Sequence, residues 1–123
     1  MVIIDTNIII DYLRRKEKSS FESFFEQKDD ELGISLVTIQ ELFSGKSTKD
    51  KEEEDFLLAL LASLVIFPYT YEIAKLAGEL IRNAKDPIEF PDAAIAATAI
   101  FHDAKLFTLN KRDFAKIAKL QLL

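Results

Sequence analysis

The sequence predicts an α/β fold of three layers, in which helices cover both faces of a central parallel sheet. Short apolar runs typical of buried strands alternate with longer segments whose apolar residues recur at helical spacing. Because parallel strands need right-handed crossovers, this alternation favours a doubly wound sheet. The 123 residues, of which 49% are hydrophobic, suffice for one sizeable core but not for two ordinary domains. We therefore expect residues 1–123 to form a single domain.

Five short apolar runs predict the strands. The first run stops at Asp5, and the third stops at Pro68, which cannot donate a hydrogen bond to a sheet. The last run lies at the end of the chain and is expected to be an edge strand. The predicted strands are Val2–Ile4, Leu32–Leu36, Leu64–Phe67, Lys105–Leu109 and Leu120–Leu123.

The segments between these strands predict helices, because their apolar residues recur every three or four positions. Thr38 begins one helix and Gly45 ends it, whereas Asp86-Pro87 breaks a later one and Pro91 suits the first turn of the next. The expected helices are one that carries Ile8, Ile9, Tyr12 and Leu13, one that Ser19 or Ser20 caps, then Thr38–Gly45, Asp55–Ser63, Thr70–Asn83, Pro91–Phe101 and Asn110–Ala118.

The composition excludes several classes of function. The chain has no Cys, so neither a disulfide nor a thiolate metal site is possible, and a reducing cytoplasm is the expected setting. The N-terminus lacks the pattern of a signal peptide, and the longest apolar run falls short of the roughly 20 residues that span a bilayer. We therefore expect a soluble protein without a membrane partner. The net charge of −5 argues against nucleic-acid binding by bulk electrostatics.

Acidic residues follow three of the predicted strands, at the edge of the sheet where ligand sites form. In an open parallel sheet this edge lies beyond the carboxyl ends of the strands. Asp5 directly follows the first strand, Glu41 lies in the first turn of the helix after the second, and Asp92 opens the last long helix. Asn110 and Asp113 stand just past the fourth strand. We therefore expect these side chains to meet at one end of the domain.

This predicted acidic cluster needs a cation. Carboxylates that approach within a few ångströms repel one another, so one of them would take up a proton unless a metal ion were bound. No His or Cys lies near these acids in the sequence, and oxygen ligands favour Mg²⁺ or Mn²⁺ over Zn²⁺. The pattern therefore predicts a divalent-metal site built from Asp5, Glu41 and Asp92.

Helix capping is the alternative explanation for each of these polar residues. Thr38 and Glu41 have the spacing of a capping box, and Asp92 could merely complement the dipole of its helix. Asn110 and Asp113 have a similar end-capping spacing, and the acid after the first strand could be a plain Asx cap. Taken singly, each explanation stays open. Taken together, the capping explanation is weaker, because chance caps need not place several acids at one edge of a sheet.

Four segments of the chain stand in the order and approximate spacing of a known family. They are residues 2–7 (VIIDTN), 34–42 (ISLVTIQEL), 91–99 (PDAAIAATA) and 106–114 (LFTLNKRDF). Together they resemble the PIN domain, and specifically the small toxin ribonucleases of the VapC type. The resemblance covers nearly the whole chain and implies a PIN-like three-layer α/β/α fold.

The resemblance implies an endoribonuclease dependent on Mg²⁺ or Mn²⁺. Such proteins are usually homodimers and are held inactive by a cognate antitoxin, whose C-terminal segment occupies the active-site groove. The resemblance makes Asp5, Glu41 and Asp92 the metal-binding carboxylates. The fourth acidic position of the family falls on Asn110, which offers a carbonyl oxygen and leaves Asp113 to supply the remaining charge. We therefore expect one firmly held ion, with any second ion waiting on the substrate phosphate.

The resemblance implies that two hydroxyl groups orient the site, and two acids are candidates for its general base. Thr6 and Thr108 match small hydroxyl positions that orient the carboxylates or the water of the metal. A metal-activated water would attack the phosphodiester, and either Asp92 or Asp113 could act as its general base.

Basic residues near the expected site could hold the phosphates of RNA despite the acidic total. They are Arg14, Arg15, Lys111 and Arg112.

Two other functions stay open at this stage. Asn110 at the fourth position would suit a catalytically weak or inactive PIN-like module that binds RNA or a protein. A stand-alone RNA-processing nuclease without an antitoxin would carry the same motifs.

Overall fold

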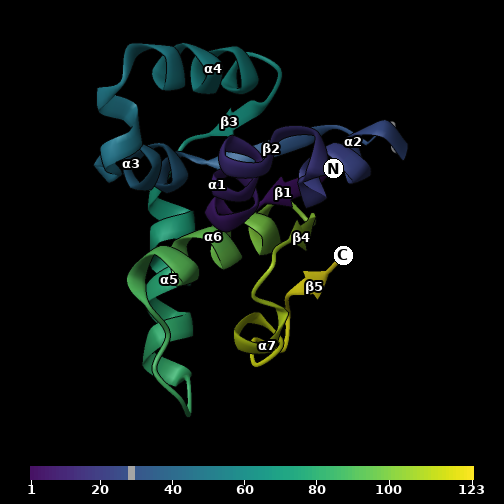
Figure 1. The fold of residues 1–123 in the computed structure, drawn as a ribbon. Helices are drawn as coiled ribbons and strands as arrows, with labels where there is room; N and C mark the ends of the chain where they lie inside the picture. Colours follow the sequence, from purple (N-terminus) through teal and green to yellow (C-terminus); the bar gives the residue numbers. More distant parts are fainter. Residues whose placement is uncertain (28–29) are drawn as a thin grey trace.

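One parallel sheet organises the protein in the computed structural model, which describes residues 1–27 and 30–123 (Figure 1). Its strand order is β3-β2-β1-β4-β5, and every neighbouring pair is parallel. The strands are β1 (Val2–Ile4), β2 (Leu32–Ser35), β3 (Val65–Phe67), β4 (Lys105–Phe107) and β5 (Gln121–Leu122). The predicted α/β class with a central parallel sheet is confirmed.

Helices cover both faces of this sheet. In the described part of the chain they are α1 (Thr6–Arg15), α2 (Ser20–Gln27), α3 (Leu36–Ser44), α4 (Lys51–Leu61), α5 (Tyr71–Asn83), α6 (Phe90–Phe101) and α7 (Lys111–Phe114), with 3₁₀ turns η1 (Lys16–Lys18) and η2 (Lys46–Lys49). None of them is both long and apolar enough to cross a membrane.

The alternation of side chains along β1 separates two cores. Val2 and Ile4 point into a core shared with α1, α2, α3 and α4, whereas Ile3 points into a core shared with α6, β4 and α7. Helix α5 packs against α6 through a third apolar cluster (Figure 1). The result is three layers with β1 at the centre, so residues that follow β1 lie in the middle of the sheet edge.

Helix α6 is buried almost all round, because its small side chains let it lie between the sheet and α5. Every residue from Ala93 to Ala99 is buried. Pro91 occupies the first turn, where its missing N–H costs nothing, as the sequence predicted. This packing holds the start of α6, and with it Asp92, at the carboxyl edge of the sheet.

Several element ends differ from the sequence predictions. Helix α3 begins at Leu36 rather than Thr38, because the Ser35 hydroxyl accepts a hydrogen bond from the Val37 amide at 3.1 Å and caps the helix earlier. Strand β4 ends at Phe107 rather than Leu109. Helix α7 ends at Phe114, so the helix expected to reach residue 118 is a single turn.

Gly33 is a position where β2 and β3 need a residue without a side chain. A Cβ atom there would lie 2.5 Å from Phe67 Cε2 and 3.1 Å from the Val65 carbonyl oxygen, so β3 would have to move. We expect Gly33→Ala to lower the free energy of unfolding by about 1–3 kcal/mol. Gly78→Ala is the control, because nothing lies within 4 Å of that Cβ. It should stabilise helix α5 by about 0.5–1 kcal/mol, and urea denaturation of both variants checks the contrast.

Candidate metal centre and active site

Asp5 is the buried acid at the centre of the sheet edge. It follows β1 directly, its side chain is almost fully covered, and its amide donates to the Phe107 carbonyl oxygen at 2.9 Å. Its Oδ2 accepts a hydrogen bond of 2.7 Å from the Thr108 hydroxyl. Burial raises the pKa of Asp5, the Thr108 hydrogen bond and the Thr6 amide oppose this rise, and the charge of Glu41 adds to it.

Glu41 comes from α3 and is held by a hydroxyl group rather than by a helix cap. Its Oε1 accepts a hydrogen bond of 2.6 Å from the Thr6 hydroxyl, which also lies 3.0 Å from the hydroxyl of buried Thr38. The capping-box alternative for Thr38 and Glu41 is therefore wrong, because Ser35 caps α3 and Glu41 lies one turn further on. The side chain of Glu41 is turned toward the end of β1.

Asp92 lies in the electrostatic field of the other acids. Its partial burial, followed by the charges of Asp5, Glu41, Asp113 and Glu89, raises its pKa to about 6. These carboxylates come from the end of β1 and from the helices α3, α6 and α7, so the fold brings together acids that are far apart in the sequence. Repulsion of this kind is what a bound cation relieves.

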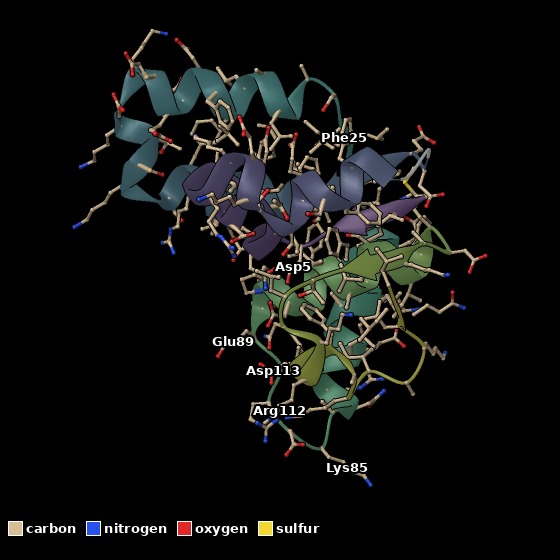
Figure 2. All side chains as sticks on the ribbon, turned by 45° about the vertical axis from the view of Figure 1, so that its right-hand side comes forward. Asp5, Phe25, Lys85, Glu89, Arg112 and Asp113 are labelled. Carbon is tan, nitrogen blue, oxygen red and sulfur yellow. The ribbon has the colours of Figure 1, made fainter. Side chains whose placement is uncertain are left out.

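Asn110 and Asp113 are joined to each other at the far side of the cluster. The Asn110 amide group donates to Asp113 Oδ2 at 2.9 Å, and the backbone amide of Asn110 donates to the Thr108 hydroxyl at 2.9 Å. The Asn110 side chain does not cap α7, so the end-capping alternative for this pair is wrong. In Figure 2, Asp113 lies below Asp5 with Glu89 beside it.

Two residues of the site carry no role in the sequence predictions. Asn7 links the start of α1 to the segment after β4, because its Oδ1 accepts from the Leu109 amide at 3.2 Å and its amide group donates to the Thr108 hydroxyl at 3.4 Å. Its position in the Asp5-Thr6-Asn7 motif is the feature of the sequence that could have indicated this role. Glu89 adds negative charge near Asp92, but it precedes α6 in an exposed loop, where no spacing pattern marks it.

The donor chemistry of the cluster fits a hard divalent ion, although the side chains do not form a ready chelate. All the groups are oxygen donors, and no Lys or Arg in the described residues forms a salt bridge with Asp5, Glu41, Asp92 or Asp113. Within the same residues, no group of three or more Asp, Glu or His side chains has an arrangement that could hold an ion. Thr6 and Asn110 each donate a hydrogen bond to one of these carboxylates, Glu41 and Asp113 respectively.

Two surface pockets adjoin the acids. One pocket of about 160 Å³ is lined by Glu89, Asp92 and Asp113, together with residues of α7 and the segment after it. The other pocket, of about 610 Å³, lies beside Glu41 and is lined by α1, α3, η2 and α4. Both faces of the acidic cluster are therefore open to a ligand.

The predicted RNA-binding residues fall into two groups. Arg14 lines the larger pocket with Glu41, while Arg15 pairs with Asp11 at 3.6 Å. Lys111 and Arg112 are exposed on α7, and Figure 2 shows Arg112 beside Asp113. The fold thus places basic side chains on both sides of the acidic cluster.

Thr108→Val should both destabilise the protein and impair the site. The change removes the hydroxyl that donates to Asp5 and accepts from Asn110, and so leaves a buried carboxylate oxygen without a donor. We expect a loss of about 1–3 kcal/mol in the free energy of unfolding. Thr108→Ser keeps the hydroxyl and should lose much less. Equal losses in urea denaturation would contradict this expectation, because losing the methyl group would then cost as much as losing the hydrogen bonds.

Comparisons with known proteins identify the family to which this fold belongs. The PIN domain family model matches residues 2–120. Ribonuclease VapC10 of Mycobacterium tuberculosis is 33% identical over 124 residues, which span 98% of this chain and 91% of that protein.

Solved structures of toxin–antitoxin complexes contain chains with the same fold. A chain in VapBC2 from Rickettsia felis, bound to a DNA fragment from its promoter, superimposes with a TM-score of 0.87 at 28% identity and covers 100% of this chain and 98% of its own length. A chain in a toxin–antitoxin complex from Klebsiella pneumoniae superimposes with a TM-score of 0.81 at 30% identity, covering 98% and 95%. The chain therefore belongs to the PIN domain family and, within it, to the VapC ribonucleases.

Proposed function

We propose that this protein is a divalent-metal-dependent endoribonuclease and the toxin of a type II toxin–antitoxin pair, acting in the cytoplasm. The observation that carries the proposal is the convergence of Asp5, Glu41 and Asp113 on Asp92. Partial burial of Asp92, followed by the charges of these acids and of Glu89, raises its pKa to about 6. Acids in mutual repulsion at the edge of a PIN fold are suited to bind a cation. The relatives named as ribonucleases span nearly the whole chain.

Asp5, Glu41, Asp92 and Asp113 would hold Mg²⁺ or Mn²⁺, with the side chain of Asn110 next to them. The bound ion would stabilise negative charge on the scissile phosphate and lower the pKa of a water molecule. The supporting hydroxyl groups prepare the ligands for this role, because each fixes one carboxylate oxygen before an ion arrives.

The proton of the attacking water passes to one of these carboxylates. The pKa of Asp92 is raised to about 6, which suits a general base. Asp113 is exposed and tied to Asn110, so its main contribution is charge and position. RNA phosphates would be held by Arg14, Lys111 and Arg112 at the border of the site.

A cognate antitoxin would bind over the pocket of about 610 Å³ beside Glu41. Apolar side chains of α1 and α3 line this pocket together with the charges of Arg14 and Glu41, so it suits an amphipathic segment. A peptide in this position would also block access to the acids. The relatives of known structure cited above come from complexes with antitoxins.

We also propose a homodimer, which the edge of the sheet supports. Edge strand β3 carries Ile66, which is 43% exposed, and such edges associate readily. Other large apolar side chains are exposed on neighbouring elements, namely Leu36, Phe43 and Phe101. Sedimentation equilibrium should give twice the chain mass of 14.0 kDa, and the mass of one chain would reject the dimer.

Cleavage of single-stranded RNA by the purified protein tests the proposed function. We expect cleavage with Mg²⁺ or Mn²⁺ and none with EDTA, and activity should return when the ion is added back. Metal-independent cleavage would reject the mechanism. RNA binding without cleavage in any metal would instead favour the non-catalytic module that Asn110 suggested.

A further inference from the structure

A basic surface lies next to the acidic site. It is formed by residues 82–85, at the end of α5, and by residues 111–119, which comprise α7 and the segment after it. These two segments hold six basic residues and one acidic residue, whereas the chain as a whole has a net charge of −5. Glu79 and Asp86 border the first segment and line the same surface, so residues 79–86 and 111–119 together hold six basic and three acidic residues, a net charge of +3.

Three adjoining pockets connect this surface to the acids, because all three are lined by Ile88 and Lys116. The first contains Asp92 and Asp113 and has a volume of about 160 Å³. The second, of about 380 Å³, contains Lys85, and the third, of about 300 Å³, contains Lys119. We call Lys85, Lys116, Lys119 and the residues around them in these pockets the Lys116 surface. Figure 2 shows Asp113, Arg112 and Lys85 progressively further from Asp5 on one side of the molecule.

The Lys116 surface suits a polyanion better than a protein partner. None of the large apolar side chains that are exposed in the described residues lines the three pockets, and the apolar residues that do line the third, such as Leu76, Leu80 and Ile117, are buried or partly buried, so no protruding apolar anchor is present there. Among residues 1–27 and 30–123, Lys116 pairs only with Asp86, at 3.7 Å, and both side chains are at least half exposed. Solvent screens such a pair, so a phosphate can replace it.

We propose that the RNA strand on one side of the scissile phosphate runs over the Lys116 surface, where Lys85, Lys116 and Lys119 hold its phosphates. The proposal rests on the proposed function and specifies how its substrate is bound. Acids at the cleavage site repel a phosphate backbone, so attraction must come from basic groups that flank it. Exposed lysines contact phosphates without reading bases, so this part of the binding should be independent of sequence.

Salt dependence of RNA binding tests the proposal on the full chain. The triple variant Lys85→Ala, Lys116→Ala and Lys119→Ala is compared with the wild type, using a labelled single-stranded RNA of about 12 nucleotides in EDTA. We expect about tenfold weaker binding at low salt, and a slope of log affinity against log salt that is smaller by about 2, from about 0.7 per lost phosphate contact.

A charge-matched control comes from the opposite side of the molecule. Lys18, Lys49 and Lys51 lie on η1, η2 and α4, away from the three pockets, and their triple Ala variant should bind RNA like the wild type. With Mg²⁺, the Lys116-surface variant should show a higher KM for the RNA of about 12 nucleotides than the control variant does.

An unchanged salt slope, or an equal loss in the control variant, would overturn the proposal. A loss of binding to poly-glutamate with unchanged RNA binding would also overturn it, in favour of an acidic protein segment. Because binding is measured in EDTA, the proposal survives if RNA is bound but not cut, which would reject only the proposed function. Normal cleavage with an unchanged slope would reject only the Lys116 surface.

Discussion

Asp92→Asn is expected to abolish RNA cleavage while making the metal-free protein more stable. The amide cannot ionise, so a ligand charge is lost, and we expect the cleavage rate to fall by about a thousandfold or more. The same change removes repulsion from the four neighbouring carboxylates that raise the pKa of Asp92. After allowance for solvent screening, the gain in the free energy of unfolding at neutral pH should be about 1–2 kcal/mol.

Asp50→Asn is the chemically matched control for this experiment. Asp50 precedes α4, is exposed, and makes no side-chain capping bond, so its variant should keep both wild-type activity and wild-type stability. Cleavage rates and urea denaturation in EDTA give the two readouts. If Asp92→Asn kept activity within about tenfold of the wild type, Asp92 would not be a ligand on which cleavage depends.

Magnesium should stabilise the protein strongly near neutral pH and much less in acid. In the folded protein the pKa of Asp92 is about 6, above the ordinary aspartate value of 3.8. Folding therefore favours the protonated form of Asp92. This contribution to the free energy of unfolding is complete below about pH 4 and is lost as the pH rises through about 6. The raised pKa of Asp5 acts in the same direction. A bound ion would then stabilise the folded state in place of the protons that Asp92 and Asp5 lose as the pH rises.

Thermal unfolding across a pH series measures this effect. At about 100 times its Kd, Mg²⁺ should add about 3 kcal/mol and raise Tm by roughly 5–10 °C near pH 7.5. The shift should shrink near pH 5, where protons compete with the ion for Asp92. In EDTA, Asp92→Asn should flatten the fall in stability between about pH 4 and 6. A larger Mg²⁺ shift at the lower pH would contradict the assignment of these acids.

The sequence was sufficient to predict the sheet and the acidic edge, because both depend on local pattern and on a general rule of parallel sheets. Val2–Ile4 reads as a buried strand, so Asp5 had to lie at its carboxyl end. The start of α3 was predicted wrongly, since both Ser35 and Thr38 are good caps and the spacing of Glu41 favoured the wrong one. Which hydroxyl caps a helix depends on where the strand before it ends.

The resemblance implied that Thr6 and Thr108 orient carboxylates, but the carboxylate that each one holds could not be predicted, because the hydrogen bonds join residues far apart in the chain. Thr6 holds Glu41, and Thr108 holds Asp5, across distances set by the packing of α1, α3 and β4. The hydrogen bonds of Asn7 with Thr108 and Leu109 depend on the same packing. Lys116 was not among the basic residues predicted to hold RNA, since the pockets around it form only when the segment after α7 meets the segment before α6.

Mn²⁺ binding, followed by electron paramagnetic resonance, tests most directly whether Asp5, Glu41 and Asp92 form one ion site. For the wild type near pH 7.5 we expect one tightly bound Mn²⁺ per chain, and the same for Asp50→Asn. Asp92→Asn should bind the ion at least about tenfold more weakly. Equal affinities in all three proteins, or no binding by the wild type even with RNA present, would show that these acids are not a metal site.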